Sequence, residues 1–201
     1  MNIKATRMEM LNYKRKLRIA RRGHKLLKDK RDELMRRFLE MIRENEKHRE
    51  VVEERLSGAY RGLAMARAQM GQNALDAATM FPQSSASLEM STRNLVGVTV
   101  PEMELVTPEV KKSYSLLTTS GELDNALSNL ESSLEDIVSL AELERKVHLL
   151  AYEIEKTRRR VNALEHILIP QLEHNIRYIS QKLAENERAN FTLRLVVKGK
   201  T

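Results

Sequence analysis

The chain has 201 residues, a formal net charge of +7 and no cysteine. The lack of cysteine excludes disulfides, thiolate metal sites and a cysteine nucleophile, and it fits a reducing compartment. Apolar residues make up 41% of the chain, aromatic residues 4% and charged residues 31%, a composition typical of a long coiled coil. The start of the chain is basic and no apolar run approaches the ~18 residues of a membrane span, so we expect a soluble, intracellular protein.

The first long segment has the periodicity of a helix and extends from about Thr6 to about Thr79. Thr6 followed by Glu9 matches a capping box. Residues that are mostly apolar or small then recur at alternating spacings of three and four, which places them on one stripe of a helix. The stripe consists of Ile42, Asn45, Arg49, Val52, Leu56, Ala59, Leu63, Ala66 and Met70. We interpret the glycines between residues 58 and 71 as a zone of close packing without a break in the helix.

The central segment, residues 81–120, is richer in turn-forming and β-branched residues. Ser87–Thr92 and Leu95–Val100 favour strands, and Arg93–Asn94 lies between them. We therefore predict a β-hairpin that turns at Arg93–Asn94, with an irregular loop as the alternative. The cap-like start at residue 107 predicts a short helix over residues 107–117.

The second long helical segment follows, and Thr119 with Glu122 is its predicted capping box. Its apolar stripe consists of Leu140, Leu143, Val147, Leu150, Ile154, Thr157, Val161, Leu164 and Leu168. Around Pro170 the stripe advances in steps of four, which predicts a stutter and a kink. The helix is expected to reach about Arg188, and the pattern beyond that residue assigns no structure.

Neither stripe can be buried by its own helix, so the two helices are expected to pair. Because the central segment reverses the chain, the pairing is antiparallel, with residue 45 opposite residue 155 and Arg49 near Glu153 or Glu155. The predicted fold is dominated by α-helix: a long antiparallel two-helix coiled coil with a short central β-hairpin and a short helix. The corresponding regions are residues 1–80, 81–120 and 121–201.

Positive charge gathers in the first helix and in one short run of the second. The prominent residues are Arg21, Arg22, Lys25, Lys28, Arg158, Arg159 and Arg160. Such clusters fit either an acidic partner or a solvated face, and nucleic acid is the usual partner of a basic patch.

No catalytic, cofactor or metal site is predicted. The five histidines lack the paired spacing of a zinc-binding helix. The sequence also lacks a phosphate-binding glycine loop and a nucleophile turn. We therefore do not expect this chain to be an enzyme by itself.

Five segments carry a specific resemblance that spans nearly the whole chain. They are Thr6–Leu11, Gly23–Met35, Glu153–Glu165, Ile169–Glu173 and Glu185–Ala189. These segments closely resemble the D subunit of the V-type and A-type rotary ATPases. The resemblance implies a non-catalytic central shaft inserted into a hexamer of catalytic A and nucleotide-binding B subunits. It also implies contacts with the F subunit and with a socket subunit above the membrane ring, at the cytoplasmic side of the membrane.

Under this resemblance the basic residues become candidates for contact with acidic stator loops. The hairpin becomes a candidate regulatory element at the end where the chain reverses. Its candidate residues are Ser87, Met90, Val96, Val98 and Val100. The alternative function is a free-standing basic coiled-coil adaptor or a nucleic-acid-binding protein. That alternative requires affinity that falls steeply with salt, and the chain lacks the interleaved aromatic residues of single-strand binders.

The two stripes predict an elongated particle. A paired helix of about 70 residues gives a maximum dimension near ~100 Å, which small-angle X-ray scattering on the chain can measure. A compact particle with a radius of gyration of about 16 Å would contradict the coiled-coil prediction.

Overall fold

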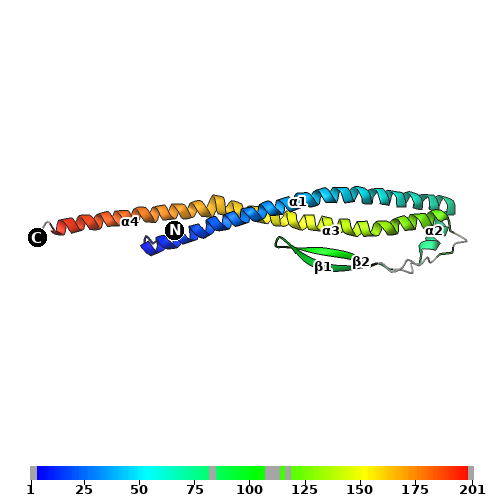
Figure 1. Cartoon of the computed structure of the whole chain (residues 1–201), viewed down its shortest axis with the longest axis horizontal. Helices are drawn as coiled ribbons and strands as arrows, with labels where there is room; N and C mark the ends of the chain where they lie inside the picture. Colours follow the sequence, from blue (N-terminus) through cyan, green and yellow to red (C-terminus); the bar gives the residue numbers. More distant parts are fainter. Residues whose placement is uncertain (1–3, 82–84, 107–113, 116–118, 199–201) are drawn as a thin grey trace. The chain divides into compact units, whose positions relative to one another are not determined.

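The computed structural model describes residues 4–81, 85–106, 114–115 and 119–198 (Figure 1). Its elements in chain order are α1 (Arg7–Met70), α2 (Gln72–Thr79), β1 (Ser87–Leu95), β2 (Val98–Val106), α3 (Gly121–Ala163), the π-helical turn η1 (Leu164–Leu168) and α4 (Ile169–Lys198). Helices dominate, and the two strands form an antiparallel hairpin in the middle of the chain. The predicted fold class is therefore confirmed.

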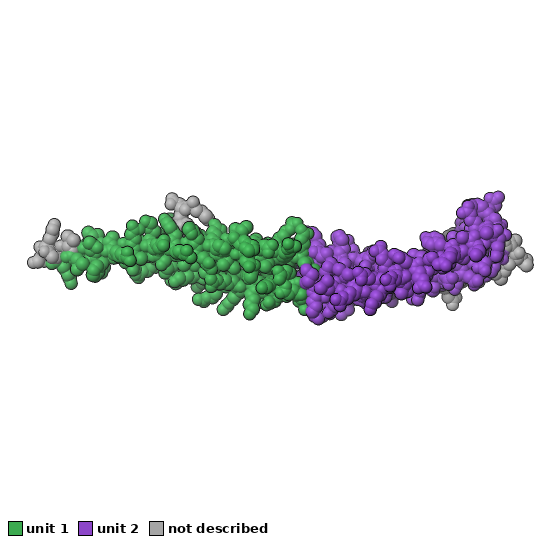
Figure 2. All heavy atoms as spheres, turned by 90° about the horizontal axis from the view of Figure 1, so that it is seen from above, with its two compact units in different colours: residues 1–33, 154–201 green, residues 34–153 purple. Residues whose placement is uncertain are grey.

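The chain divides into two compact units, and one of them combines the two ends of the sequence (Figure 2). Unit 1 combines residues 1–33 with residues 154–201, and unit 2 comprises residues 34–153. Both units therefore contain one stretch of α1 and one stretch of the C-terminal helical region.

In unit 1 the start of α1 packs antiparallel to α4. The guanidinium of Arg7 contacts Glu187 at 2.6 Å, and that of Arg21 contacts Glu173 at 2.7 Å. The buried residues of this unit are Ala20, Ile154, Thr157, Val161, Leu172, Asn175 and Ile179. They recur at helical spacing along the C-terminal part, as the predicted stripe requires.

The start of α1 has half of the predicted capping box. The Thr6 hydroxyl oxygen accepts a hydrogen bond from the Glu9 amide at 3.2 Å. The Thr6 amide donates to the Lys4 carbonyl at 3.0 Å. The predicted return contact from Glu9 to that amide is thus replaced by a backbone bond.

The predicted disturbance near Pro170 takes the form of η1. The Ile169 amide donates to the Leu164 carbonyl, five residues back, which is the pattern of a π-turn. Proline has no backbone donor, so the regular ladder cannot continue through it. The wider turn rotates the side chains, and Leu168 is 40% exposed. Its predicted place in the buried stripe was wrong.

In unit 2 the remaining part of α1 packs antiparallel to α3. The buried residues of the pair are Leu34, Val52, Ala59, Ala66, Leu123, Ala126, Ser133 and Leu150. Arg55 of α1 contacts the Asp136 carboxylate and the Ser132 carbonyl of α3. Antiparallel pairing at this contact places residue 45 near about residue 146.

The predicted helix register was therefore wrong by roughly ten residues. Arg49 contacts Glu53 on its own helix, and Glu155 contacts Arg159 on its own helix. An apolar stripe identifies the face of a helix that is buried, but similar stripes can slide by whole turns. The contacts that select one register come from particular side chains, such as Arg55 and Asp136.

The single helix predicted to Thr79 is interrupted at Gly71. This residue has φ 80° and ψ 162°, a conformation that glycine adopts without the steric cost of a Cβ. After the break, α2 places Leu75 in a small core with Ala66 and Leu123. The interpretation of residues 58–71 as unbroken was thus wrong at Gly71.

The start of α3 is one residue later than predicted. Ser120, and not Thr119, is the capping residue, because its hydroxyl accepts from the Glu122 amide at 3.2 Å. The Thr119 hydroxyl donates to the Ser115 carbonyl instead. The short helix predicted over residues 107–117 falls almost wholly outside the described residues.

The predicted hairpin is confirmed, but its turn lies further along the chain. Arg93 and Asn94 belong to β1, where they pair with Val100 and Thr99. The turn is Val96–Gly97, with φ values of 52° and 78°. Two-residue hairpin loops favour positive φ at both positions, because that twist matches the strands.

The hairpin lies alongside α3 (Figure 1). The Met103 amide of β2 donates to the Glu142 carboxylate at 2.7 Å. Glu142 lies about 30 Å along α3 from Gly121, at ~1.5 Å per residue. The expectation that the hairpin lies at the end where the chain reverses was therefore wrong. Val100, on the same strand, is only 2% exposed.

Two glycines of α1 differ in the space around them. A Cβ on Gly62 would lie 3.1 Å from the Ala126 Cβ, whereas one on Gly58 would have no neighbour within 4 Å. The prediction of close packing thus holds for Gly62.

This difference predicts unequal effects on stability when each of the two glycines is replaced by alanine. Gly58→Ala should raise the free energy of unfolding by up to about 1 kcal/mol, because alanine favours the helix. Gly62→Ala should be less favourable than Gly58→Ala by about 1–3 kcal/mol, since α1 and α3 must separate. Urea unfolding followed by circular dichroism measures both. Equal gains at the two positions would contradict the close contact.

Candidate functional site

The predicted basic residues all lie in unit 1, and all are exposed. We call them the basic surface: Arg21, Arg22, Lys25 and Lys28 on α1, and Arg158, Arg159 and Arg160 near the end of α3. The exposure of the arginine run follows from the helix periodicity, because Thr157 and Val161 occupy the buried stripe on either side of it.

The structure spreads the basic surface along unit 1 instead of gathering it at one point. Arg21 lies beside Glu173, as their 2.7 Å contact shows. Arg158 precedes Glu173 by about 22 Å of helix, at ~1.5 Å per residue. Lys28 is near Glu165 and lies between these two positions along the unit. A long partner, or several loops, could therefore contact the surface at different levels.

Acidic side chains neutralise part of the basic surface. Arg21 is paired with Glu173 and Arg159 with Glu155. The pKa of Glu165 is lowered, chiefly by its hydrogen bond with His24, with smaller contributions from nearby charges that include Lys28. Exposed ion pairs of this kind contribute little to stability. They can exchange for contacts with a partner at low cost.

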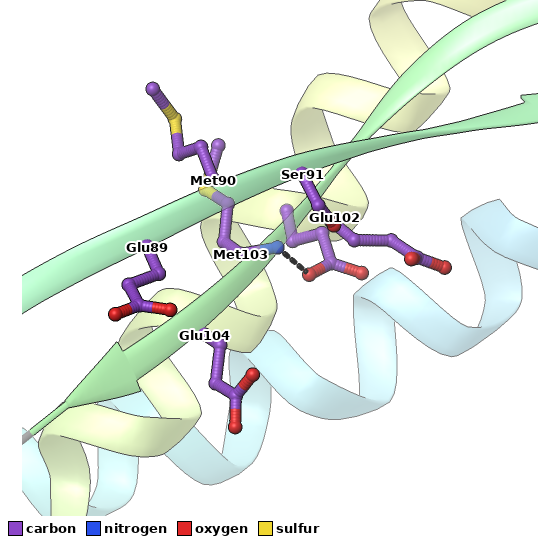
Figure 3. A pocket seen from close by; sticks show the side chains of 7 residues that line it. Glu89, Met90, Ser91, Glu102, Met103 and Glu104 are labelled. Carbon is purple, nitrogen blue, oxygen red and sulfur yellow. Dashed lines mark hydrogen bonds between the residues drawn. The ribbon is translucent and has the colours of Figure 1, made fainter.

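The hairpin carries an acidic groove that sequence reasoning missed (Figure 3). Its lining residues are Glu89, Met90, Ser91, Glu102, Met103 and Glu104 from the strands and Glu142 from α3. The alternation of glutamate with other residues in the strands was a usable signal for three of these. The place of Glu142 had no such signal, because only the tertiary fold brings α3 to the hairpin.

The predicted hairpin residues have different environments. Met90 pairs with Met103 and is 69% exposed, whereas Val100 is buried. Val98 pairs with Leu95 beside the turn. The remaining two sit at opposite ends of the hairpin: Ser87 at the open end and Val96 in the turn.

Glu142 has two hydrogen-bond donors around its carboxylate. They are the Met103 amide, at 2.7 Å, and the Lys146 ammonium group. Burial alone would raise the pKa of Glu142, but the hydrogen bonds from Lys146 and Met103 outweigh it and lower that pKa. The side chains of Glu142 and Lys146 are 19% and 16% exposed, so solvent screens this pair less than the outer ion pairs.

Neither a clustered metal site nor a helix that could span a membrane occurs in the described parts of the chain. Among these residues, no group of three or more His, Cys, Asp or Glu side chains is arranged to hold a metal ion. None of the described helices combines the length and the apolar character that crossing a membrane requires. What these parts do present is paired helices, exposed charge and a docked hairpin.

Comparison with known proteins identifies the family. Residues 9–199 match the family of ATP synthase D subunits. The chain belongs to this family. The D subunit of the V-type ATP synthase of Acetivibrio thermocellus is 50% identical, and the match covers 98% of this chain and 91% of that protein. The corresponding proteins of Clostridioides difficile and Fusobacterium nucleatum are 49% and 46% identical, over 98% of this chain and 90% and 95% of theirs.

Membership in the D-subunit family confirms two predictions from the sequence. The chain is a non-catalytic subunit, and its place is the central stalk of a V-type rotary ATPase. The alternative of a free-standing adaptor or nucleic-acid binder does not fit a family match over almost the whole chain.

Proposed function

We propose that this chain transmits torque between the A and B subunits of the catalytic hexamer and an ion-translocating membrane ring. The observation that carries the proposal is the antiparallel pairing of helices within each unit, in a chain that matches the D-subunit family over nearly its full length. Closure of successive catalytic subunits would push on different sides of the shaft. Rotation driven by ion flow would reverse the cycle toward synthesis.

A shaft must resist twisting, and the contacts within each unit supply this resistance. Arg21–Glu173 joins the helices of unit 1, and Arg55–Asp136 joins those of unit 2. Both contacts lie beside a buried stripe, so sliding of one helix along the other would break ion pairs and expose apolar surface together. The outer faces also carry many exposed charged side chains, which can form weak contacts with a stator.

The basic surface is our candidate for contact with acidic loops of the A and B subunits. Several weak contacts suit a turning shaft better than one strong contact, because each must break once in every step. The F subunit and a membrane-side socket subunit are the further partners that we propose. They place the chain at the cytoplasmic face of the membrane, as a peripheral part of the complex.

Charge reversal tests the proposed stator contact. Replacing Arg158, Arg159 and Arg160 together by glutamate should lower ATP hydrolysis or torque of the assembled complex by about threefold or more, because attractive contacts become repulsive. Helix content by circular dichroism should not change, since these side chains lie outside the buried stripe. The matched control replaces the same three residues by lysine and should keep the activity. Full turnover and torque in the glutamate variant would overturn the assignment.

Removal of the hairpin tests whether it modulates the ATPase. The strands extend from Ser87 to Val106, so a short Gly-Ser linker should replace that whole range. We expect preserved helix content and assembly but an altered ATPase rate or altered coupling, because a two-stranded hairpin contributes little to helix pairing. The matched control is Thr92→Val, at an exposed position of β1, which keeps a β-branched residue in the strand and should leave the rate unchanged. Failure of the linker variant to assemble, or an unchanged rate and coupling, would contradict this role.

A further inference from the structure

The contact between the hairpin and α3 depends on a small number of groups. The polar part of this contact among the described residues is the hydrogen bond from the Met103 amide to the Glu142 carboxylate, which is 2.7 Å long. Lys146, one turn further along α3, also donates to Glu142 (Figure 3 shows the bond to Met103). Val100, on the same strand as Met103, is 2% exposed. Docking of the hairpin on α3 thus includes a charge-assisted hydrogen bond from β2.

The charges around this contact oppose it. Glu89 and Glu104 are directly opposite one another in the hairpin ladder, and like charges in such pairs are destabilising. Both line the same groove as Glu142, together with Glu102. Arg93 reaches Glu102 at 3.3 Å, and Lys146 neutralises Glu142. The hairpin therefore brings an acidic surface against an acidic residue, and Lys146 is what makes that approach favourable.

The donor of the docking bond has a specific position on the strand. Met103 pairs with Met90 in the ladder, and its amide bonds Glu142 on α3 instead of β1. A strand edge with unsatisfied amides can pair with another chain, so covering it is important for a two-stranded sheet. Glu142 covers this edge of β2 with a side chain, and a side chain can dissociate from the edge more readily than a paired strand can.

We propose that Glu142, held by Lys146, is a releasable latch that docks the hairpin on α3. With the latch closed, the Met103 amide is bonded and the hairpin lies along the helix. With the latch open, the hairpin separates from α3 and both its edges become available. The latch itself follows from the geometry of unit 2, and only its effect on ATP hydrolysis rests on the proposed function.

Protonation of Glu142 should open the latch. A neutral carboxyl loses its attraction to Lys146 and accepts a weaker hydrogen bond. Because the pKa of Glu142 is lowered, the latch should be fully closed at neutral pH and should open only as the pH falls through that lowered value. The carboxylates of Glu89, Glu102 and Glu104 line the same groove, so variants are needed to assign the pH response to Glu142.

The direct test measures hydrogen exchange of the Met103 amide by NMR in the full chain. Glu142→Ala should accelerate that exchange at least tenfold, whereas Glu144→Ala, an exposed neighbour on the same helix, should leave it within twofold. Alanine favours the helix, so both variants keep α3. Unchanged Met103 exchange in Glu142→Ala would overturn the latch.

A distance measured between β2 and α3 shows whether the whole hairpin leaves the helix or whether only the Met103 amide exchanges faster. The chain has no cysteine, so spin labels can be placed at Thr99→Cys on β2 and Ser139→Cys on α3. Glu142→Ala should broaden the distance distribution and shift it to longer values, and Glu144→Ala should not. An identical, narrow distribution in both variants would show that the hairpin docks without Glu142 and would overturn the proposal.

Lys146→Gln tests the pH dependence. Removing the ammonium group raises the pKa of Glu142, so the acid-induced rise in Met103 exchange should move to higher pH than in the unaltered chain. No movement of that transition would exclude Lys146 from the latch. The effect on ATP hydrolysis is measured in the assembled complex. If the distance measurement shows an open latch and the ATPase rate is unchanged, the proposed regulatory role of the hairpin is contradicted. The latch itself is not.

Discussion

The narrow apolar stripe of each long helix is the constraint on which the rest of the structure depends. A long helix with one such stripe gains little stability alone and must bury the stripe against another helix. In unit 1 the second helix comes from the other end of the sequence, and in unit 2 it comes from the far side of the hairpin. Because aromatic residues make up only 4% of the chain, the interface is thin, and small residues carry much of it. Ala20, Ala59, Ala66 and Ala126 are all buried.

A thin interface makes individual contacts important for alignment. Close approach at Gly62 and Ala126 and the ion pair between Arg55 and Asp136 define how α1 faces α3. Apolar stripes tolerate sliding, whereas a backbone contact at one glycine and a paired charge do not. Such alignment suits the proposed torque-transmitting shaft, because the helices resist sliding while the basic surface stays exposed for the proposed weak contacts with a stator.

The hairpin is held in place by different interactions from those that pair the helices. Its strands expose most of their side chains, and a hydrogen bond from the Met103 amide to Glu142 joins it to α3. Buried residues recur along much of the paired helices, whereas the hydrogen bond to Glu142 holds the hairpin at one level of α3. Opening of the proposed latch would therefore leave the buried stripe of the paired helices in place.

Local sequence patterns were sufficient to predict the elements that depend on interactions between residues close together in the chain. Helical periodicity, the Thr6 cap, the strand composition and the disturbance at Pro170 were all predicted from near neighbours. The basic surface followed from the same periodicity, since it depends only on which face of each helix is buried. The family resemblance, carried by motifs along the chain, indicated the function.

Only the tertiary structure decided which distant residues meet. The register of α1 against α3 depends on contacts such as Arg55–Asp136, and the docking of the hairpin on Glu142 depends on how the chain returns after β2. The break at Gly71 lets α2 place Leu75 in a core with Leu123. Residue spacing determines the face that a helix buries, but the axial position and the partner are chosen by the energies of contacts between segments far apart in the sequence.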